Sequence, residues 1–97
     1  MPIKPAQPLR QATLVDVRNI NDVYLQLSQQ LAFPPHFGHN LDALFDLLSR
    51  ELPGPLRIFW PNALAAKAHF PQHDFDDLLG VFNDAVEERD DLEVVIS

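Results

Sequence analysis

The sequence predicts an α/β fold in which a three-stranded parallel sheet is packed by about four helices. Short β-rich segments alternate with segments of helical periodicity, in the order strand, helices, strand, helices, strand. This order generates right-handed crossovers between parallel strands, and a chain of 97 residues suits one domain with its own core. We expect residues 1–11, which contain three prolines, to form a flexible N-terminal arm and residues 12–97 to form the domain.

The first strand is predicted at residues 12–17, where the sequence ATLVDV is β-rich. Asn21 can then cap a helix whose apolar residues recur at helical spacing and which ends near Ala32. The next six residues, FPPHFG, contain two prolines and do not continue a helix. We expect these residues, 33–38, to form a stiff, exposed loop in which Gly38 adopts backbone angles that other residues avoid.

A second helix is predicted directly after this loop. Asn40 can cap it, because an asparagine side chain accepts a hydrogen bond from the first helical turn. Leu41, Leu44, Phe45 and Leu48 fall at positions i, i+3, i+4 and i+7, which predicts a buried stripe. The tripeptide PGP then bounds the exit of this helix.

Two further strands and two further helices complete the prediction. LRIFW, residues 56–60, is apolar and short enough to be a strand buried on both faces. ALAAKAHF, residues 63–70, can form a short helix, and Asp74 can cap a long one. The core face of that long helix consists of Phe75, Leu78, Leu79, Phe82, Ala85 and Val86. The ending LEVVIS, residues 92–97, is the third strand.

Charge is distributed unevenly along the chain. Residues 1–39 carry a net charge of +1, whereas residues 40–97 hold four basic and twelve acidic side chains. A surface of this kind repels nucleic acid and favours a partner with a positive patch. The alternative explanation is an acidic surface that only maintains solubility.

Several functional classes lack a signal. The chain has no cysteine, which excludes disulfides and thiolate metal sites, and it has no apolar run long enough for a signal peptide or a membrane span. We expect a cytoplasmic protein without a cofactor. The histidine pairs 36/39 and 69/73 give only a weak indication of a zinc or nickel site, since the first pair lies on a loop and the second spans a proline.

The segment HFGHNLDALFDLL places two aspartates one helical turn apart, beside the leucine stripe. Asp42 lies in the first turn, where the helix dipole favours an anion, whereas Asp46 gains little from the dipole and repels its neighbour. Either the pair forms part of a solvated acidic face or it binds a cationic partner. His36 and Phe37 on the stiff loop, and Phe45 between the aspartates, favour a binding surface because preorganised anchors lower the entropy cost of association.

The run LAFPPHFGHNLDALFDLL, residues 31–48, closely resembles the hallmark segment of the barstar family. The segments PLRIFW, VFNDA and DLEVVIS resemble barstar segments in order and spacing, so that the resemblance covers residues 12–97. In that family the loop and second helix block the active site of a secreted bacterial ribonuclease, and acidic groups take the place of substrate phosphates. The resemblance therefore implies a barstar-like fold and an intracellular ribonuclease inhibitor, not an enzyme, with a role in immunity to a toxic nuclease.

The resemblance also implies the binding residues. Asp42 and Asp46 match the family's two acidic helix positions, and Gly38 and Asn40 match its loop glycine and capping asparagine. The expected contacts with a basic, extracellular-type ribonuclease are His36, Phe37, Gly38, His39, Asn40, Asp42, Phe45, Asp46 and, more weakly, Asp84. Family residues of other types stand at the positions of His36, His39, Phe45, Glu51 and Asp84. We expect a monomer when free and no direct contact with nucleic acid or membrane.

Two alternatives stay open from the sequence. The chain could be a barstar-like module for a different basic partner, such as another toxin or a regulatory protein, or a small enzyme dependent on a metal or on paired carboxylates. The inhibitor hypothesis requires the carboxylates of Asp42 and Asp46 to face outward and to be free of the chain's own lysines and arginines.

Overall fold

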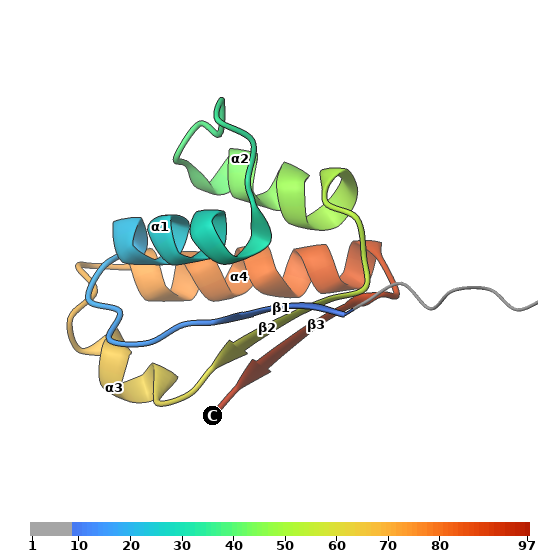
Figure 1. Ribbon diagram of the computed structural model, residues 1–97. Coiled ribbons are helices and arrows are strands. Elements are labelled where there is room, and N and C mark those ends of the chain that lie inside the picture. Colours follow the sequence, from blue (N-terminus) through green and yellow to red (C-terminus); the bar gives the residue numbers. More distant parts are fainter. Residues whose placement is uncertain (1–8) are drawn as a thin grey trace, which may run out of the picture.

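A computed structural model of the protein describes residues 9–97 (Figure 1). Its elements are, in chain order, β1 (Arg10–Thr13), α1 (Ile20–Leu31), α2 (Leu41–Asp46), the π-helix η1 (Leu47–Glu51), β2 (Leu56–Trp60), α3 (Ala63–Lys67), α4 (Asp74–Glu88) and β3 (Leu92–Ile96). The three strands form one parallel sheet in the order β1-β2-β3. The predicted fold class, a three-stranded parallel sheet packed by about four helices, is confirmed.

The helices α1 and α4 lie on one face of the sheet, and α2 with η1 lies on the outer side of α4 (Figure 1). Because the strand order follows the chain order, both crossovers run in the same direction across the sheet. Crossovers of one hand then place their helices on the same face. Within residues 9–97, no helix is both long enough and apolar enough to cross a bilayer.

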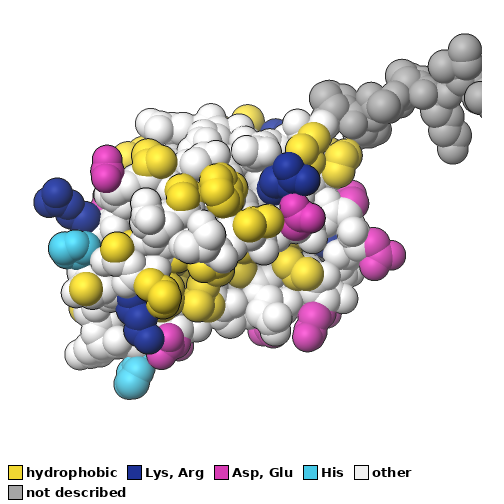
Figure 2. All heavy atoms as spheres, turned by 90° about the horizontal axis from the view of Figure 1, so that it is seen from below, with side chains coloured by type: hydrophobic (Ala, Val, Ile, Leu, Met, Phe, Trp, Pro, Cys, Tyr) yellow, Lys and Arg dark blue, Asp and Glu magenta, His cyan; other side chains and the backbone are white. Residues whose placement is uncertain are grey.

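Strand β2 shows the consequence of this one-sided packing. Leu56, Ile58 and Trp60 are buried, whereas the alternate residues Arg57 and Phe59 are only half-buried. The prediction that this strand is buried on both faces is therefore wrong. It assumed helices on both sides of the sheet, whereas α1 and α4 lie on the same side. Figure 2 views the molecule from below, and hydrophobic side chains reach the surface there among polar and backbone atoms.

The hydrophobic core lies between the sheet and its helices. Its largest fully buried side chains are those of Trp60, Phe82, Leu14, Leu27, Leu31, Leu44, Leu48, Leu56, Ile58, Leu78 and Val23. The predicted core face of α4 is confirmed at Phe75, Leu78, Phe82 and Ala85, but Val86 is exposed. The stripe predicted for the second helix is confirmed at Leu44 in α2 and at Leu48 in η1, and both elements contact α4. Leu41 and Phe45 are only partly buried.

The first strand differs from its prediction at both ends. Strand β1 begins at Arg10, two residues before the predicted start, and ends at Thr13. Asp16 has a left-handed backbone with φ 51°, which a strand does not accommodate. Val17 is nevertheless buried, as the apolar pattern of the segment implies. The predicted arm, residues 1–11, is wrong at Arg10 and Gln11, which belong to β1, and its residues 1–8 lie outside the described residues, where the arm stays a prediction.

Two helix caps also differ from their predictions by one or two positions. The cap of α1 is Asn19, not Asn21, and its side chain accepts a hydrogen bond from the Asp22 backbone N–H at 2.9 Å. Asp74 is the first residue of α4 and does not cap it, because His73 occupies the cap position without a side-chain hydrogen bond. A cap residue must precede the helix with a non-helical backbone, and Asn19 meets this condition with φ −159° and ψ 174°.

Two glutamines of α1 bond the outer edge of the chain at the end of β1 and just after it. The Gln30 side chain accepts from the Thr13 N–H at 2.8 Å and donates to the Thr13 carbonyl at 2.9 Å. The Gln26 side chain makes the same two bonds with Val15, at 2.9 and 2.8 Å. The amides therefore satisfy backbone groups that a neighbouring strand would otherwise bond.

Candidate functional site

Asn40 links the predicted loop to helix α2. Its side-chain oxygen accepts a hydrogen bond from the Ala43 backbone N–H at 2.7 Å, which confirms it as the cap of α2. Its side-chain nitrogen donates to the Gly38 carbonyl at 3.1 Å. One side chain thus satisfies the first turn of the helix and fixes the end of the loop that enters it.

Gly38 is required for a different reason from the one predicted. No described glycine has a positive φ, so the expectation that Gly38 adopts unusual backbone angles is wrong. The left-handed residue is its neighbour His39, with φ 51°. A Cβ atom on Gly38 would lie 3.0 Å from the Asn40 side-chain nitrogen, so a side chain there would crowd the cap. Close approach, not conformational freedom, explains the glycine.

Phe37 holds the loop against the body of the protein. Its ring centroid lies 5.4 Å from that of Tyr24 and 5.0 Å from that of Phe33, both in edge-to-face geometry. Phe37 is only 8% exposed, so the prediction of an exposed loop is wrong at this residue. The His39 ring packs on the same group, 5.1 Å from Phe37. These contacts order the loop before any partner arrives.

Tyr24 lies at the base of this aromatic group. Burial raises the pKa of its phenol, and the negative charge of Asp74 raises it further. Its hydroxyl is therefore neutral at physiological pH and contributes no charge beneath the loop.

A shallow hollow of about 100 Å³ lies between the loop and α2. It is lined by Pro34, His36, Phe37, Gly38, Ala43, Asp46, Leu47 and Glu51. The structure thus brings together four of the predicted site residues, His36, Phe37, Gly38 and Asp46, with Glu51 beside them. Two larger hollows, each of about 420 Å³, have linings that include none of the predicted site residues.

The two aspartates of α2 differ in their surroundings. Asp42 is exposed and, within residues 9–97, forms no ion pair, as the inhibitor hypothesis requires. The Asp46 side chain is 48% exposed, but its Oδ1 accepts a hydrogen bond from Arg50 Nη2 at 2.7 Å. The requirement that both carboxylates be free of internal cations is therefore not met at Asp46. Phe45, between them, is half-buried and packs against the core.

Arg50 is a residue that the sequence reasoning missed. The signal was present, because residues four apart on a helix are neighbours and Asp46 and Arg50 have that spacing. The Arg50 side chain is 69% exposed, and an ion pair at such exposure contributes only about 0.2–1 kcal/mol. A partner's cation in a desolvated setting can compete with it.

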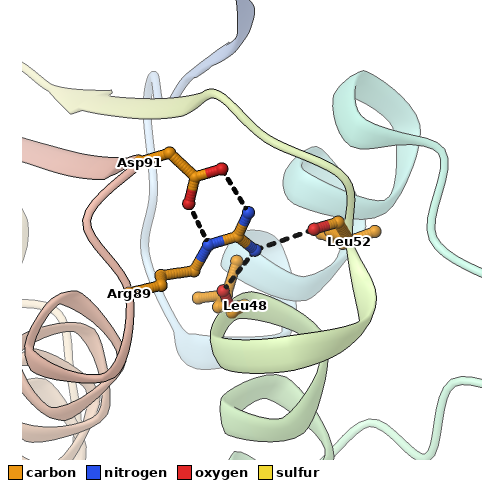
Figure 3. A network of polar contacts seen from close by, with 4 residues as sticks. All are labelled: Leu48, Leu52, Arg89 and Asp91. Atoms are coloured by element: carbon orange, nitrogen blue, oxygen red, sulfur yellow. Dashed lines mark hydrogen bonds and ion pairs between the residues drawn. The ribbon is translucent and has the colours of Figure 1, made fainter.

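Arg89 supports the far end of the site helix (Figure 3). Its Nη1 donates to the carbonyl oxygens of Leu48 and Leu52, at 3.2 and 2.7 Å, near the end of η1. Its Nε and Nη2 bond both carboxylate oxygens of Asp91, at 2.5 and 2.9 Å. This hydrogen bonding with Arg89 lowers the pKa of Asp91. The ion pair of Arg89 and Asp91 therefore connects the chain after α4 to η1, which continues the helix α2 that ends at Asp46.

Asp84 stands apart from the other predicted site residues. It is exposed on α4, it does not line the hollow, and it forms no ion pair within the described part of the chain. Among residues 9–97, no three histidine or carboxylate side chains lie together in a way that could hold a metal ion.

Comparison with known proteins adds two findings. The family model described as "Barstar (barnase inhibitor)" matches residues 7–97. A Bacillus subtilis (strain 168) protein named "Putative ribonuclease inhibitor YrdF" is 33% identical over 82 residues, which cover 84% of this chain and 89% of that protein.

Proposed function

Because the chain belongs to the barstar (barnase inhibitor) family, we propose that it inhibits a bacterial ribonuclease by placing α2 and the preceding loop in the enzyme's cationic active site. The family consists of inhibitors, so the proposed action is occlusion without turnover and without a cofactor. In this proposal the protein acts in the cytoplasm as a monomer and protects a cell from a basic ribonuclease that is made for secretion.

The observation that carries the proposal is the outward-facing pair of aspartates on a capped helix. Asp42 and Asp46 lie four residues apart on α2, and each exposes carboxylate oxygen to solvent. A ribonuclease active site binds the phosphates of RNA with cationic side chains. Two carboxylates on a rigid helix can bond the same groups, and arginine can bond a carboxylate through two parallel hydrogen bonds.

The loop supplies the rest of the proposed contact surface. His36, Gly38 and His39 are exposed on it, and the Phe37 aromatic group and Asn40 hold it in place. A loop that is already ordered loses less conformational entropy on binding. The proposed contact residues are those expected from the sequence, with Phe37 and Asn40 acting by support: His36, Phe37, Gly38, His39, Asn40, Asp42, Phe45, Asp46 and Asp84.

The test is an RNA-cleavage assay with purified barnase and related microbial ribonucleases, with and without this protein. We expect inhibition at near-stoichiometric amounts. Asp46→Ala should weaken inhibition by at least about 30-fold, because removing one member of a desolvated charge pair costs 2 kcal/mol or more.

Glu93→Ala is the matched control. Glu93 also pairs with an arginine at 2.7 Å, but on β3 and with Arg57 of β2, which points away from the buried face of the sheet. This variant loses the same charge and the same kind of ion pair, and it should inhibit like the wild type. Equal inhibition by both variants would contradict the assignment of Asp46. Inhibition of none of the enzymes would favour a different basic partner.

A further inference from the structure

Within residues 9–97, one of the two site carboxylates has an internal cation. Asp46 Oδ1 lies 2.7 Å from Arg50 Nη2, and the other carboxylate oxygen of Asp46 accepts no hydrogen bond from the described residues. Asp42, one turn earlier, forms no ion pair with any described residue. The free protein thus already holds a guanidinium at a position that the proposed function gives to the enzyme.

Arg50 lies where it affects a partner directly. It belongs to η1, which continues α2 without a break, and its side chain is 69% exposed. Its neighbour Glu51 lines the hollow together with Asp46. The positive charge of Arg50 therefore lies on the edge of the surface that a ribonuclease would cover, and it opposes a cationic active site.

A partner's arginine can reach Asp46 in two ways. It can displace Arg50 and bond both oxygens, which costs the existing ion pair, or it can share the carboxylate with Arg50, which brings two like charges together. Both routes weaken binding.

We infer that Arg50 is an internal competitor for the Asp46 carboxylate, which lowers the affinity for cationic partners. The inference rests on the proposed function, since it concerns the same site. It also predicts that removing Arg50 makes this protein a tighter inhibitor.

The experiment compares Arg50→Gln with the matched control Arg57→Gln. Each variant removes one arginine that pairs with one carboxylate at 2.7 Å, but Arg57 and its partner Glu93 lie on the strands β2 and β3. Binding is measured by titration calorimetry with barnase and by chemical-shift titration with a hexa-arginine peptide, at low and at moderate salt. Circular dichroism and thermal unfolding check that both variants fold.

We expect Arg50→Gln to bind both probes about fivefold tighter than the wild type at low salt, with a smaller gain as salt increases. Arg57→Gln should change the affinity less than twofold. Equal changes in affinity for the two variants would show that net charge alone causes the effect. An unchanged or lower affinity for Arg50→Gln would show that Arg50 does not compete. Any of these results overturns the inference.

The two proposals fail in different ways. If barnase is inhibited through Asp46 but Arg50→Gln gains nothing over Arg57→Gln, the proposed function stands and the competition does not exist. If the wild type inhibits no ribonuclease but the peptide binds Arg50→Gln more tightly than Arg57→Gln, the competition exists and the proposed target is wrong.

Discussion

A Cβ atom on Gly54 would overlap the carboxylate of Asp91 and would also lie 2.6 Å from the Arg89 Nη2 atom. Gly54 belongs to the connection between η1 and β2, whereas Asp91 immediately precedes β3. The two connections meet at the ion pair that also bonds the end of η1 (Figure 3). A hydrogen atom at Gly54 is therefore the only side chain that leaves this pair intact.

Gly54→Ala should lower the free energy of unfolding by about 1–3 kcal/mol, because the methyl group must displace a carboxylate held by two hydrogen bonds. Urea denaturation measures the change. Gly80→Ala is the control, since Gly80 lies inside α4 and no described atom beyond its adjacent residues and its own helix backbone lies within 4 Å of an added Cβ. In that variant the free energy of unfolding should increase by about 0.5–1 kcal/mol, because alanine has a higher helix propensity than glycine. A neutral Gly54→Ala would show that the connection moves aside easily.

The stability of the protein should fall as the pH decreases below about 4. Arg89 lowers the pKa of Asp91 in the folded state, so the folded protein holds this carboxylate charged at a pH where the unfolded chain binds a proton. The stabilisation is complete above the ordinary carboxyl pKa and is lost as the pH falls through the lowered folded value. Unfolding by urea at a series of pH values measures it.

Asp91→Asn should reduce that dependence of stability on pH, because it removes the titrating group and retains the side-chain shape. Asp90→Asn changes the exposed neighbour and should keep the wild-type dependence. Identical pH profiles for Asp91→Asn and the wild type would mean that other carboxylates account for the acid sensitivity.

Asn40→Ala and Asn19→Ala should cost similar stability but differ in their effect on binding. Each asparagine caps a helix by accepting a backbone N–H bond, so each loss should lower the unfolding free energy by about 1 kcal/mol. Asn40 also holds the Gly38 carbonyl, so its loss should release the loop and weaken ribonuclease inhibition several-fold. Thermal unfolding and the RNA-cleavage assay measure the two effects. Equal inhibition by the two variants would show that the order of the loop does not contribute to inhibition.

Ser49→Ala should stabilise the protein by about 1 kcal/mol. Ser49 is 6% exposed in η1, and its hydroxyl has no hydrogen-bond partner within the described residues. A buried hydroxyl without a partner loses its hydration on folding and gains nothing in return, whereas alanine has no such group. The midpoint of urea denaturation should increase. A decrease would reveal a hydrogen bond that the hydroxyl makes in solution.

Local patterns were sufficient to predict much of this fold. Alternation of β-rich and helical segments gave the parallel sheet, and Asn40 was correctly predicted as a cap because capping involves residues three apart. The burial of Phe37 could not be predicted, because it depends on Tyr24 and Phe33 meeting in space. The open face of β2 followed from strand order, which no single segment encodes.

In the candidate site, too, features set by local sequence could be predicted and features set by long-range contacts could not. The acidic pair Asp42 and Asp46 could be predicted, because the two residues lie one helical turn apart. The spacing of Asp46 and Arg50 predicts their ion pair in the same way. The bonds from Arg89 to the carbonyl groups of Leu48 and Leu52 could not be predicted from the sequence, because these partners lie 41 and 37 positions away along the chain. Long-range polar contacts carry no periodicity that would reveal them.

The glutamine bonds to Thr13 and Val15 limit how this protein can aggregate. Those amides occupy the outward backbone groups of Thr13 and Val15, which an incoming strand would need, whereas β3 has no strand beyond it within the described residues. Two molecules that paired through β3 would then present their β1 edges, where a third molecule would meet two residues whose N–H and C=O groups are already bonded. Strand addition to the native sheet is therefore disfavoured beyond a pair of molecules.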